Sequence, residues 1–202
     1  MGEKKNKYYY FYILAALLVL FDQFTKLLFK DIFGIANIFG LQNDYAPSGS
    51  IPVFGDFVQF VYVENEGMAF GITFGSFKIL LSLFSVVASA ALVYLIYKIK
   101  DSHFAVKLGF ALILAGATGN LIDRCFYGLI FNEGPLFYGR VVDFIQVDIP
   151  DIRLFGRQYT HFPVFNVADS CVTCGAILLI LFNKKIPHIS FSKADAQQNC
   201  SK

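Results

Sequence analysis

Four aspartates lie in or beside strongly apolar stretches of this chain: Asp22, Asp123, Asp143 and Asp169. A carboxylate in such surroundings is costly unless it is protonated or paired, so each position calls for a compensating use. Two carboxyl groups held close together in a partly dry pocket share one proton. Such a pair contains a base that can draw a proton from attacking water and an acid that can donate to the developing oxyanion, which is chemistry that hydrolyses an amide.

The stretch RVVDFIQVDI, residues 140–149, alternates with a period of two and therefore predicts a strand. Asp143 is the lone charge on the face shared with Val141, Ile145, Val147 and Ile149. Asp148 falls on the opposite, mixed face. A single acid on a buried face needs a proton or a polar partner. Asp169, near the start of the apolar run 164–182, is predicted to be that partner.

Two of these acids also have a purely structural interpretation. Asp22 and Lys26 stand one helical turn apart and can neutralise each other as supporting structure. Asn166 and Asp169 fit a capping box, in which Asn166 begins a helix and Asp169 reaches back to its backbone. Both interpretations stay open beside the chemical one.

Asn120 and Asp123 repeat that spacing at the predicted end of an apolar helix, where acceptor side chains are not needed as caps. Unless a new helix begins there, both residues face inward for another reason. The preceding run GATGN, residues 116–120, permits close contact with a neighbouring helix. Close packing would hold Asn120 and Asp123 rigidly against that neighbour.

The composition indicates an integral membrane protein. Of the 202 residues 56% are hydrophobic and 16% are charged, a balance that soluble domains of this size rarely sustain. The formal net charge is only +2, and the basic clusters abut apolar runs, as is typical of membrane orientation and not of nucleic-acid binding. These clusters lie at residues 4–7, 98–100 and 184–185.

Four apolar segments have about the 20 residues that a bilayer crossing needs. They run over residues 8–29, 77–97, 104–122 and 164–182. The lysines of the short turn at 98–100 place that turn and both termini on the cytoplasmic side. The long connections then face outward, and the alternating stretch 57–63 predicts strands there. We expect an all-α integral membrane fold of four transmembrane helices with a small outward-facing β-rich element.

This organisation predicts one membrane domain over residues 1–186 and a short polar cytoplasmic tail over 187–202. It also brings Asp22, Asp123 and Asp169, from three different helices, to one level near the outer leaflet. A site is therefore expected at that boundary.

Other hydrolytic machinery is missing from the sequence. The histidines at 103, 161 and 188 lack the spacing of a zinc peptidase, and no serine lies in a GxSxG motif. Cys171 and Cys174 are interpreted as small packing residues on one helix face. We expect no metal and no cofactor, which leaves an aspartyl mechanism.

Together the motifs resemble those of a known family, lipoprotein signal peptidase or signal peptidase II, the bacterial membrane aspartyl peptidase. The resemblance covers nearly the whole chain in five ordered blocks, which are DQFTK at 22–26, NEGMAF at 65–70, GATGNLIDR at 116–124, VVDFI at 141–145 and FNVADS at 165–170. It implies that Asp143 and Asp169 form the catalytic dyad. It also implies supporting or substrate-binding positions at Asp22, Lys26, Asn65, Gly67, Asn120, Asp123, Arg124 and Asn166. Asp123 is the rival for catalysis, because Arg124 could pair with it or with the substrate.

The resemblance further implies cleavage of diacylglyceryl-modified prolipoproteins before the lipidated cysteine, by a monomer in the bacterial inner membrane. The partners expected are that precursor and membrane lipid, with no nucleic acid. Met68 replaces the usual Ala, and the outer stretches 125–139 and 148–162 look longer than typical. A proton-coupled carrier would also place acids in spans, although neither internal repeats nor discontinuous helices are visible here. A structural partner in a membrane complex would explain the packing glycines but not the converging acids.

Overall fold

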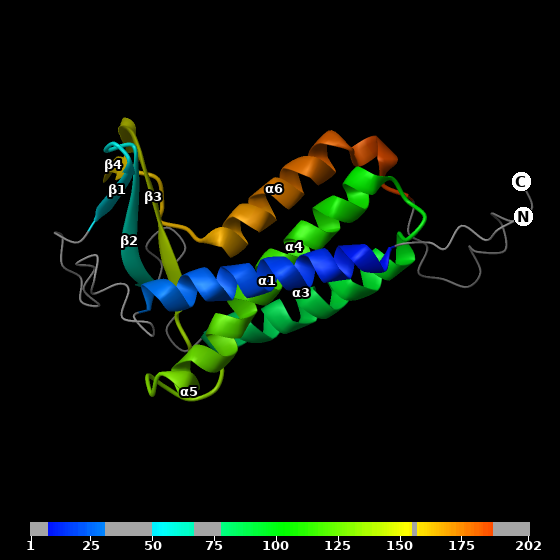
Figure 1. Cartoon of the computed structure of the whole chain (residues 1–202), viewed down its shortest axis with the longest axis horizontal. Coiled ribbons are helices and arrows are strands. Elements are labelled where there is room, and N and C mark those ends of the chain that lie inside the picture. Colours follow the sequence, from blue (N-terminus) through cyan, green and yellow to red (C-terminus); the bar gives the residue numbers. More distant parts are fainter. Residues whose placement is uncertain (1–7, 31–49, 67–77, 155–156, 188–202) are drawn as a thin grey trace, which may run out of the picture.

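The structure is a computed structural model that describes residues 8–30, 50–66, 78–154 and 157–187. The predicted site residue Gly67 and the residues of the predicted tail from 188 onward lie outside these ranges. Four main helices run side by side, and an antiparallel sheet lies across one end of them (Figure 1). The chain is thus mostly helical, with the strands gathered in one place.

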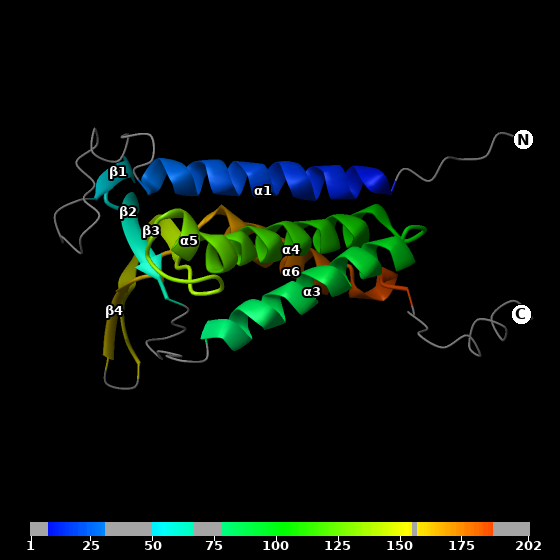
Figure 2. The same ribbon diagram turned by 90° about the horizontal axis from the view of Figure 1, so that it is seen from below.

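The helices are α1 (Tyr9–Phe29), α3 (Lys78–Lys98), α4 (Phe104–Ile122) and α6 (Val167–Leu181). Helix α4 occupies the middle and packs against the other three, as the two views in Figures 1 and 2 agree. Three helical stretches, 9–29, 79–98 and 104–130, are long and apolar enough to cross a membrane. Helix α6 is apolar but has only 15 residues. The membrane fold is consistent with the prediction, and the number of four crossings stays a prediction.

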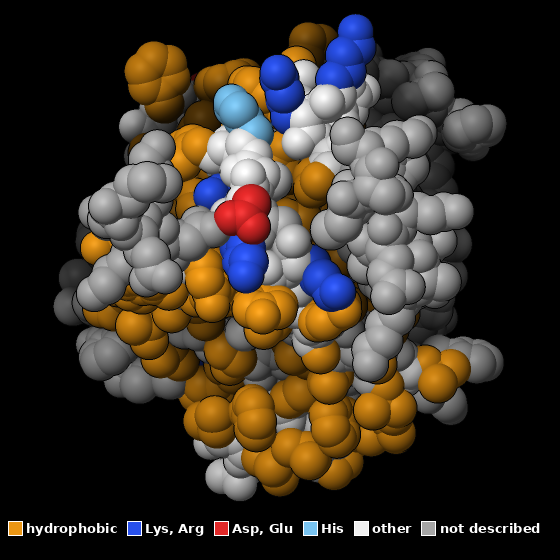
Figure 3. Space-filling view, turned by 90° about the vertical axis from the view of Figure 1, so that its right-hand side faces the viewer, with side chains coloured by type: hydrophobic (Ala, Val, Ile, Leu, Met, Phe, Trp, Pro, Cys, Tyr) orange, Lys and Arg blue, Asp and Glu red, His pale blue; other side chains and the backbone are white. Residues whose placement is uncertain are grey.

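The outer faces of these helices are apolar. Large side chains that are about half exposed or more include Leu17, Leu20, Phe21, Phe84, Val87, Ile180 and Leu181. An apolar surface of this kind suits lipid as its solvent. The end of the bundle with the α3–α4 turn differs, because lysines and a histidine gather there within a hydrophobic surround (Figure 3).

The third apolar helix does not stop at Ile122, where the sequence predicted its end. It continues through a π-helical segment, Asp123–Tyr127, into the short helix α5 (Gly128–Ile130). Asp123 is therefore inside a continuous helical run and needs no capping explanation. A π-turn rotates the side chains that follow it, and such turns are frequent at functional sites.

The sheet has the strand order β1-β2-β3-β4, and every neighbouring pair is antiparallel. Its strands are β1 (Ile51–Phe54), β2 (Val58–Asn65), β3 (Val141–Leu154) and β4 (Arg157–His161). In the β2–β3 ladder Val63 lies opposite Asp143 and Asn65 opposite Val141. The rings of Phe29, Phe60 and Phe144 join the end of α1 to both strands, with 4.3 Å between the stacked rings of Phe29 and Phe144.

The prediction that β3 buries only one face is wrong at its start. Val141, Val142, Asp143 and Phe144 are all buried, with exposed fractions of 4% or less. The beginning of this strand pairs with β2 along one edge and with Phe165 along the other, and it also contacts α1 and the π-helical segment, so it is enclosed. Asp143 is therefore more fully enclosed than a period-two pattern implies.

The cysteine prediction needs a similar correction. Cys171 is buried, whereas Cys174 is exposed, and both are free thiols. Helix α6 buries Ala168, Cys171 and Gly175, and Cys174 lies off this line. Of these two cysteines, Cys171 alone is a packing residue.

Candidate active site

The predicted pair, Asp143 and Asp169, comes together because the segment before α6 pairs with β3. The backbone N–H of Ile145 donates to the carbonyl of Phe165 at 2.8 Å, and Phe165 N–H donates to the carbonyl of Ile145 at 3.0 Å. This bridge places Asn166, the next residue along the chain, beside Asp143. Helix α6 then begins directly after Asn166.

Both carboxylate oxygens of Asp143 accept hydrogen bonds from neutral amides. Asn166 Nδ2 donates to Oδ1 at 2.7 Å, and Asn65 Nδ2 donates to Oδ2 at 3.1 Å. Burial and the nearby negative charge of Asp169 raise the pKa of Asp143 to about 7, against the opposing effects of Asn65, Lys26 and Asn166. Asp143 is therefore a carboxyl group that can still carry a proton near neutral pH.

Asp169 is fixed by the cap of its own helix, α6, and by a side chain of the neighbouring helix α4. Asn166 accepts from the backbone N–H of Asp169 at 2.9 Å, and Asp169 Oδ2 accepts from the backbone N–H of Asn166 at 3.2 Å. The capping box is confirmed. Asp169 Oδ1 also accepts a 2.7 Å bond from Asn120 Nδ2. Asn166 thus bonds to both aspartates, so the capping role and membership of the acid cluster coexist.

A buried lysine organises the other two acids. Lys26 Nζ lies 2.8 Å from Asp22 Oδ2 and 2.8 Å from Asp123 Oδ2, and it donates to Asn120 Oδ1 at 2.9 Å. Lys26, Asp22 and Asp123 are 1% exposed or less. The predicted pairing of Asp22 with Lys26 is confirmed, and Asp123 joins it. We call these three residues the Lys26 triad.

Each acid of the Lys26 triad also holds the backbone next to one member of the predicted pair. Asp22 Oδ1 accepts from the N–H of Ala168 at 2.8 Å, one residue before Asp169. Asp123 Oδ2 accepts from the N–H of Val142 at 3.4 Å, one residue before Asp143. The Lys26 triad therefore positions both acids from one shared centre.

Close helix contact makes this positioning possible. A Cβ atom on Gly116 would collide with the carbonyl oxygen of Ala168, and one on Gly119 would lie 2.6 Å from Asp22 Oδ2. A side chain at Gly116 would displace the α6 backbone, and one at Gly119 would displace the carboxyl group of Asp22. The predicted packing role of Gly116 and Gly119 is confirmed.

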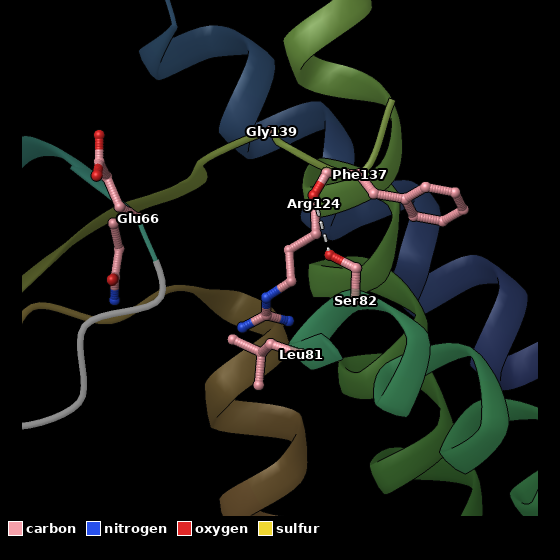
Figure 4. Close-up of a pocket in the computed structure, with 7 residues that line it drawn as sticks. Glu66, Leu81, Ser82, Arg124, Phe137 and Gly139 are labelled. Atoms are coloured by element: carbon pink, nitrogen blue, oxygen red, sulfur yellow. Dashed lines mark hydrogen bonds between the residues drawn. The ribbon is translucent and has the colours of Figure 1, made fainter. Parts of the chain in front are cut away.

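Arg124 does not pair with Asp123 or with Asp169 in the described part of the chain. Its Nη1 donates to the carbonyl of Asn120 at 3.4 Å, and its buried Nε has no hydrogen-bond partner among the described residues. In Figure 4 the side chain extends towards Leu81 and Ser82, in a small pocket also lined by Asn65, Glu66, Phe137 and Gly139. The pocket is thus adjacent to Asp143 through Asn65, and it contains an unused donor.

Comparison with known proteins identifies the family. The family model described as signal peptidase (SPase) II matches residues 14–184. The chain belongs to the signal peptidase II family. It is therefore a peptidase of a bacterial membrane family, and the resemblance drawn from the five motif blocks is confirmed.

Individual relatives agree with the signal peptidase II assignment. The lipoprotein signal peptidase of Pelodictyon phaeoclathratiforme is 36% identical over 87% of this chain and 90% of that protein. The lipoprotein signal peptidase of Porphyromonas gingivalis is 37% identical over 84% and 81%. A solved structure described as a bacterial membrane enzyme, at 1.9 Å resolution, aligns with a TM-score of 0.58 and 30% identity over 88% of this chain and 94% of that one.

Two polar residues of this signal peptidase II site were missed in the sequence. Gln23 Nε2 donates to Asp123 Oδ1 at 2.8 Å and to Asp22 Oδ2 at 3.2 Å, and Tyr127 OH donates to Gln23 Oε1 at 3.1 Å. Gln23 lies inside the block DQFTK, where its neighbour Asp22 was the available signal. Tyr127 had no such signal, because the π-turn that directs it inward is not visible in the sequence.

Proposed function

We propose that the chain is an aspartyl endopeptidase in which Asp143 and Asp169 together activate the water that cleaves a peptide bond. The observation that carries this proposal is that Asn166 bonds to both acids while no lysine or arginine of the described residues forms a salt bridge with either. A pair without a cation retains one proton between its members. That protonation state supplies a base and an acid at the same site.

The reaction then needs no covalent intermediate. The ionised carboxylate takes a proton from water as its oxygen attacks the carbonyl carbon, and the protonated carboxyl donates to the developing oxyanion. When the tetrahedral intermediate collapses, the C–N bond breaks and the leaving nitrogen receives a proton from the pair. The raised pKa of Asp143 supports its part as the member that holds the shared proton.

The surrounding residues take positioning roles in this proposal. Asp22, Lys26, Asn120, Asp123 and Asn166 fix the elements that carry the two acids, and Asn65 orients Asp143. Asp123 is assigned to this group and not to catalysis, because Gln23, Lys26 and Val142 already occupy its two oxygens. Arg124 is proposed to use its unpaired donor on a backbone carbonyl of the substrate. Gly67 is proposed as a site residue on the family motif alone.

The proposed substrate is a diacylglyceryl-modified prolipoprotein, cleaved immediately before the lipidated cysteine. The name of the relatives, lipoprotein signal peptidase, supports this substrate. A lipidated cysteine is held in the leaflet, so its scissile bond lies near the headgroup boundary. The acids lie at the sheet end of apolar helices, and the lysine-rich turn lies at the other end, which supports a site at the outer leaflet with both termini cytoplasmic. The enzyme is proposed to act as a monomer built from residues 1–186.

The test uses the purified protein with lipid-modified precursor and with the same precursor lacking the lipid. We expect a product that begins at the modified cysteine, as judged by mass, and no product from the unmodified precursor. Asp143→Asn and Asp169→Asn should each abolish processing although the protein still inserts and folds. Full turnover by either variant would remove that residue from the dyad. Transport of a solute in vesicles without any cleavage would favour the carrier alternative instead.

A further inference from the structure

A second buried lysine lies one turn after the Lys26 triad, at the end of α1. The side chain of Lys30 is only 5% exposed, and its Nζ contacts Glu64 Oε1 and lies 2.7 Å from Glu133 Oε1. The same ammonium stands 4.6 Å from the centre of the Phe131 ring. Lys30 thus ties α1 to strand β2 and to the outer segment 125–139.

Glu64 is the centre of this second network. Besides Lys30 it accepts from Tyr62 OH at 2.6 Å and from Arg140 Nη1 at 3.2 Å. Burial alone would raise the pKa of Glu64, but the bonds from Lys30 and Tyr62 outweigh it, so the pKa lies below its ordinary value. Arg140 Nη2 reaches Glu66 Oε1 at 2.9 Å as well. One arginine therefore links the residues before and after Asn65.

Strand geometry connects this network to the proposed dyad. Successive side chains of a strand point to opposite faces, so Glu64 and Asn65 face opposite ways. Glu64 faces Lys30 and Arg140, and Asn65 donates to Asp143 Oδ2 at 3.1 Å. Any rotation of this part of β2 that releases Glu64 would also change the distance from Asn65 to Asp143.

We propose that Lys30 and Arg140 are positioning residues, which clamp Glu64 and Glu66 and thereby hold Asn65 in hydrogen-bonding contact with Asp143. This inference rests on the proposed function, because it matters only if Asp143 takes part in hydrolysis. Without Lys30, the carboxylate of Glu64 would lose its closest cation and would turn towards water. Asn65 would then move away from Asp143, and that carboxyl group would lose one hydrogen-bond donor.

The consequence is a change in the pH dependence of processing and not only in its rate. Groups that face Asp143 are Asp169 from α6, Lys26 from α1, Asn166, Asn65 and the guanidinium of Arg124. The bond from Asn65 favours the ionised form of Asp143, so its loss raises the pKa of that carboxyl. The alkaline limb of the pH–rate profile, which reports loss of the shared proton, should move to higher pH.

The experiment measures kcat, KM and the pH profile for Lys30→Met, Lys30→Arg, Asn65→Ala and the double variant Lys30→Met/Asn65→Ala, with lipid-modified precursor. We expect Lys30→Met to lower kcat roughly tenfold with KM unchanged. The alkaline limb should move up by roughly half a pH unit to one unit, as in Asn65→Ala. The double variant should be no slower than Asn65→Ala alone. Lys30→Arg, which keeps the charge, should recover most of the rate.

Lys98→Met is the matched control. Lys98 also ends a helix and stands over an aromatic ring, with 5.5 Å from Nζ to the centre of Tyr94, but it lies in the lysine-rich end of the bundle. This variant should keep the wild-type rate and profile. If Lys30→Met does not fold, Glu64→Gln carries the test with the same expected shift.

A slowed Lys30→Met with the wild-type pH profile, or rate losses that multiply in the double variant, would overturn the inference. If Glu64→Gln carries the test, a wild-type profile for it would do the same. A different result would overturn the proposed function. Asp143→Asn that processes normally would remove the dyad itself, whereas an inactive Asp143→Asn beside an unaffected Lys30→Met would remove only the clamp.

Discussion

Two pairs of aspartates lie on either side of Asn120, and their surroundings differ in one respect. Asp22 and Asp123 share the ammonium of Lys26, whereas Asp143 and Asp169 accept only from amide N–H groups among the described residues. Lys26 offsets part of the negative charge of the first pair, and the carboxyl oxygens of that pair anchor the backbone at Ala168 and Val142. The second pair has no such cation, and we propose that its members share one proton. In this proposal the first cluster supplies position and the second supplies chemistry.

Replacing one acid of the uncompensated pair should give the largest effect. Asp169→Asn removes a base but keeps the helix cap, because an asparagine oxygen can still accept from the N–H of Asn166. We expect processing to fall by about 10²–10⁴-fold with little change in the unfolding temperature. Asp148→Asn, an exposed acid on the same strand as Asp143, is the control and should be fully active. A large loss of stability in Asp169→Asn would blur the distinction between the two pairs.

Removing the cation should give the opposite signature, a loss of stability. Lys26→Met leaves two buried carboxylates without compensation, and breaking a buried ion pair costs about 3–5 kcal/mol of unfolding free energy. Denaturation in detergent or lipid measures it. The triple variant Lys26→Met/Asp22→Asn/Asp123→Asn should recover part of the loss, since no charge remains in the Lys26 triad. Unfolding of Lys26→Met at the wild-type midpoint would contradict the assignment of the Lys26 triad as a structural anchor.

The pH dependence of kcat/KM for processing should also distinguish the two pairs of aspartates. The pKa of Asp143, raised to about 7, means that the shared proton is lost as the pH rises through that value. Above it, kcat/KM should fall about tenfold per pH unit, provided that the folded fraction is constant. A rate that is flat up to about pH 9 would show that no such proton is needed.

A smaller effect should follow from loosening the helix contact that both pairs share. The added methyl group in Gly116→Ala meets the backbone of Ala168 and would push α6 away, which we expect to cost about 1–3 kcal/mol and to slow processing. Gly109→Ala is the comparison, because its Cβ would meet the flexible end of Leu179 at 2.8 Å and would stay 3.1 Å from the nearest backbone atom, the carbonyl oxygen of Gly175. Equal effects of the two variants would show that the contact near Asp169 has no special part.

The sequence was most informative where a pattern is local. The apolar runs predicted the helices, the alternation at residues 57–63 predicted a strand, and the spacing of Asp22 and Lys26 predicted their ion pair, which the structure contains. The presence of Asp143 and Asp169 in one network also followed from the cost of burying an acid alone. Their assignment as a catalytic dyad remains a proposal.

What the sequence could not predict depends on tertiary contacts. The π-turn after Ile122 redirects Tyr127 towards Gln23, and no local pattern announces it. The full burial of residues 141–144 arises because β2 and Phe165 pair with β3 while α1 and the π-helical segment pack against it. The partnership of Lys30 with Glu64 and Glu133 joins positions 34 and 103 residues apart, which spacing rules for helices cannot detect.

The most direct test of the central claim is to observe the shared proton. Infrared difference spectroscopy detects the carboxylic-acid C=O stretching band of a buried protonated aspartate, and it can be followed as the pH is raised. We predict a band that disappears as the pH rises through about 7, is absent in Asp143→Asn and persists in Asp22→Asn. A band that survives in Asp143→Asn, or one that is lost in Asp22→Asn, would contradict the claim that the cation-free pair carries the chemistry.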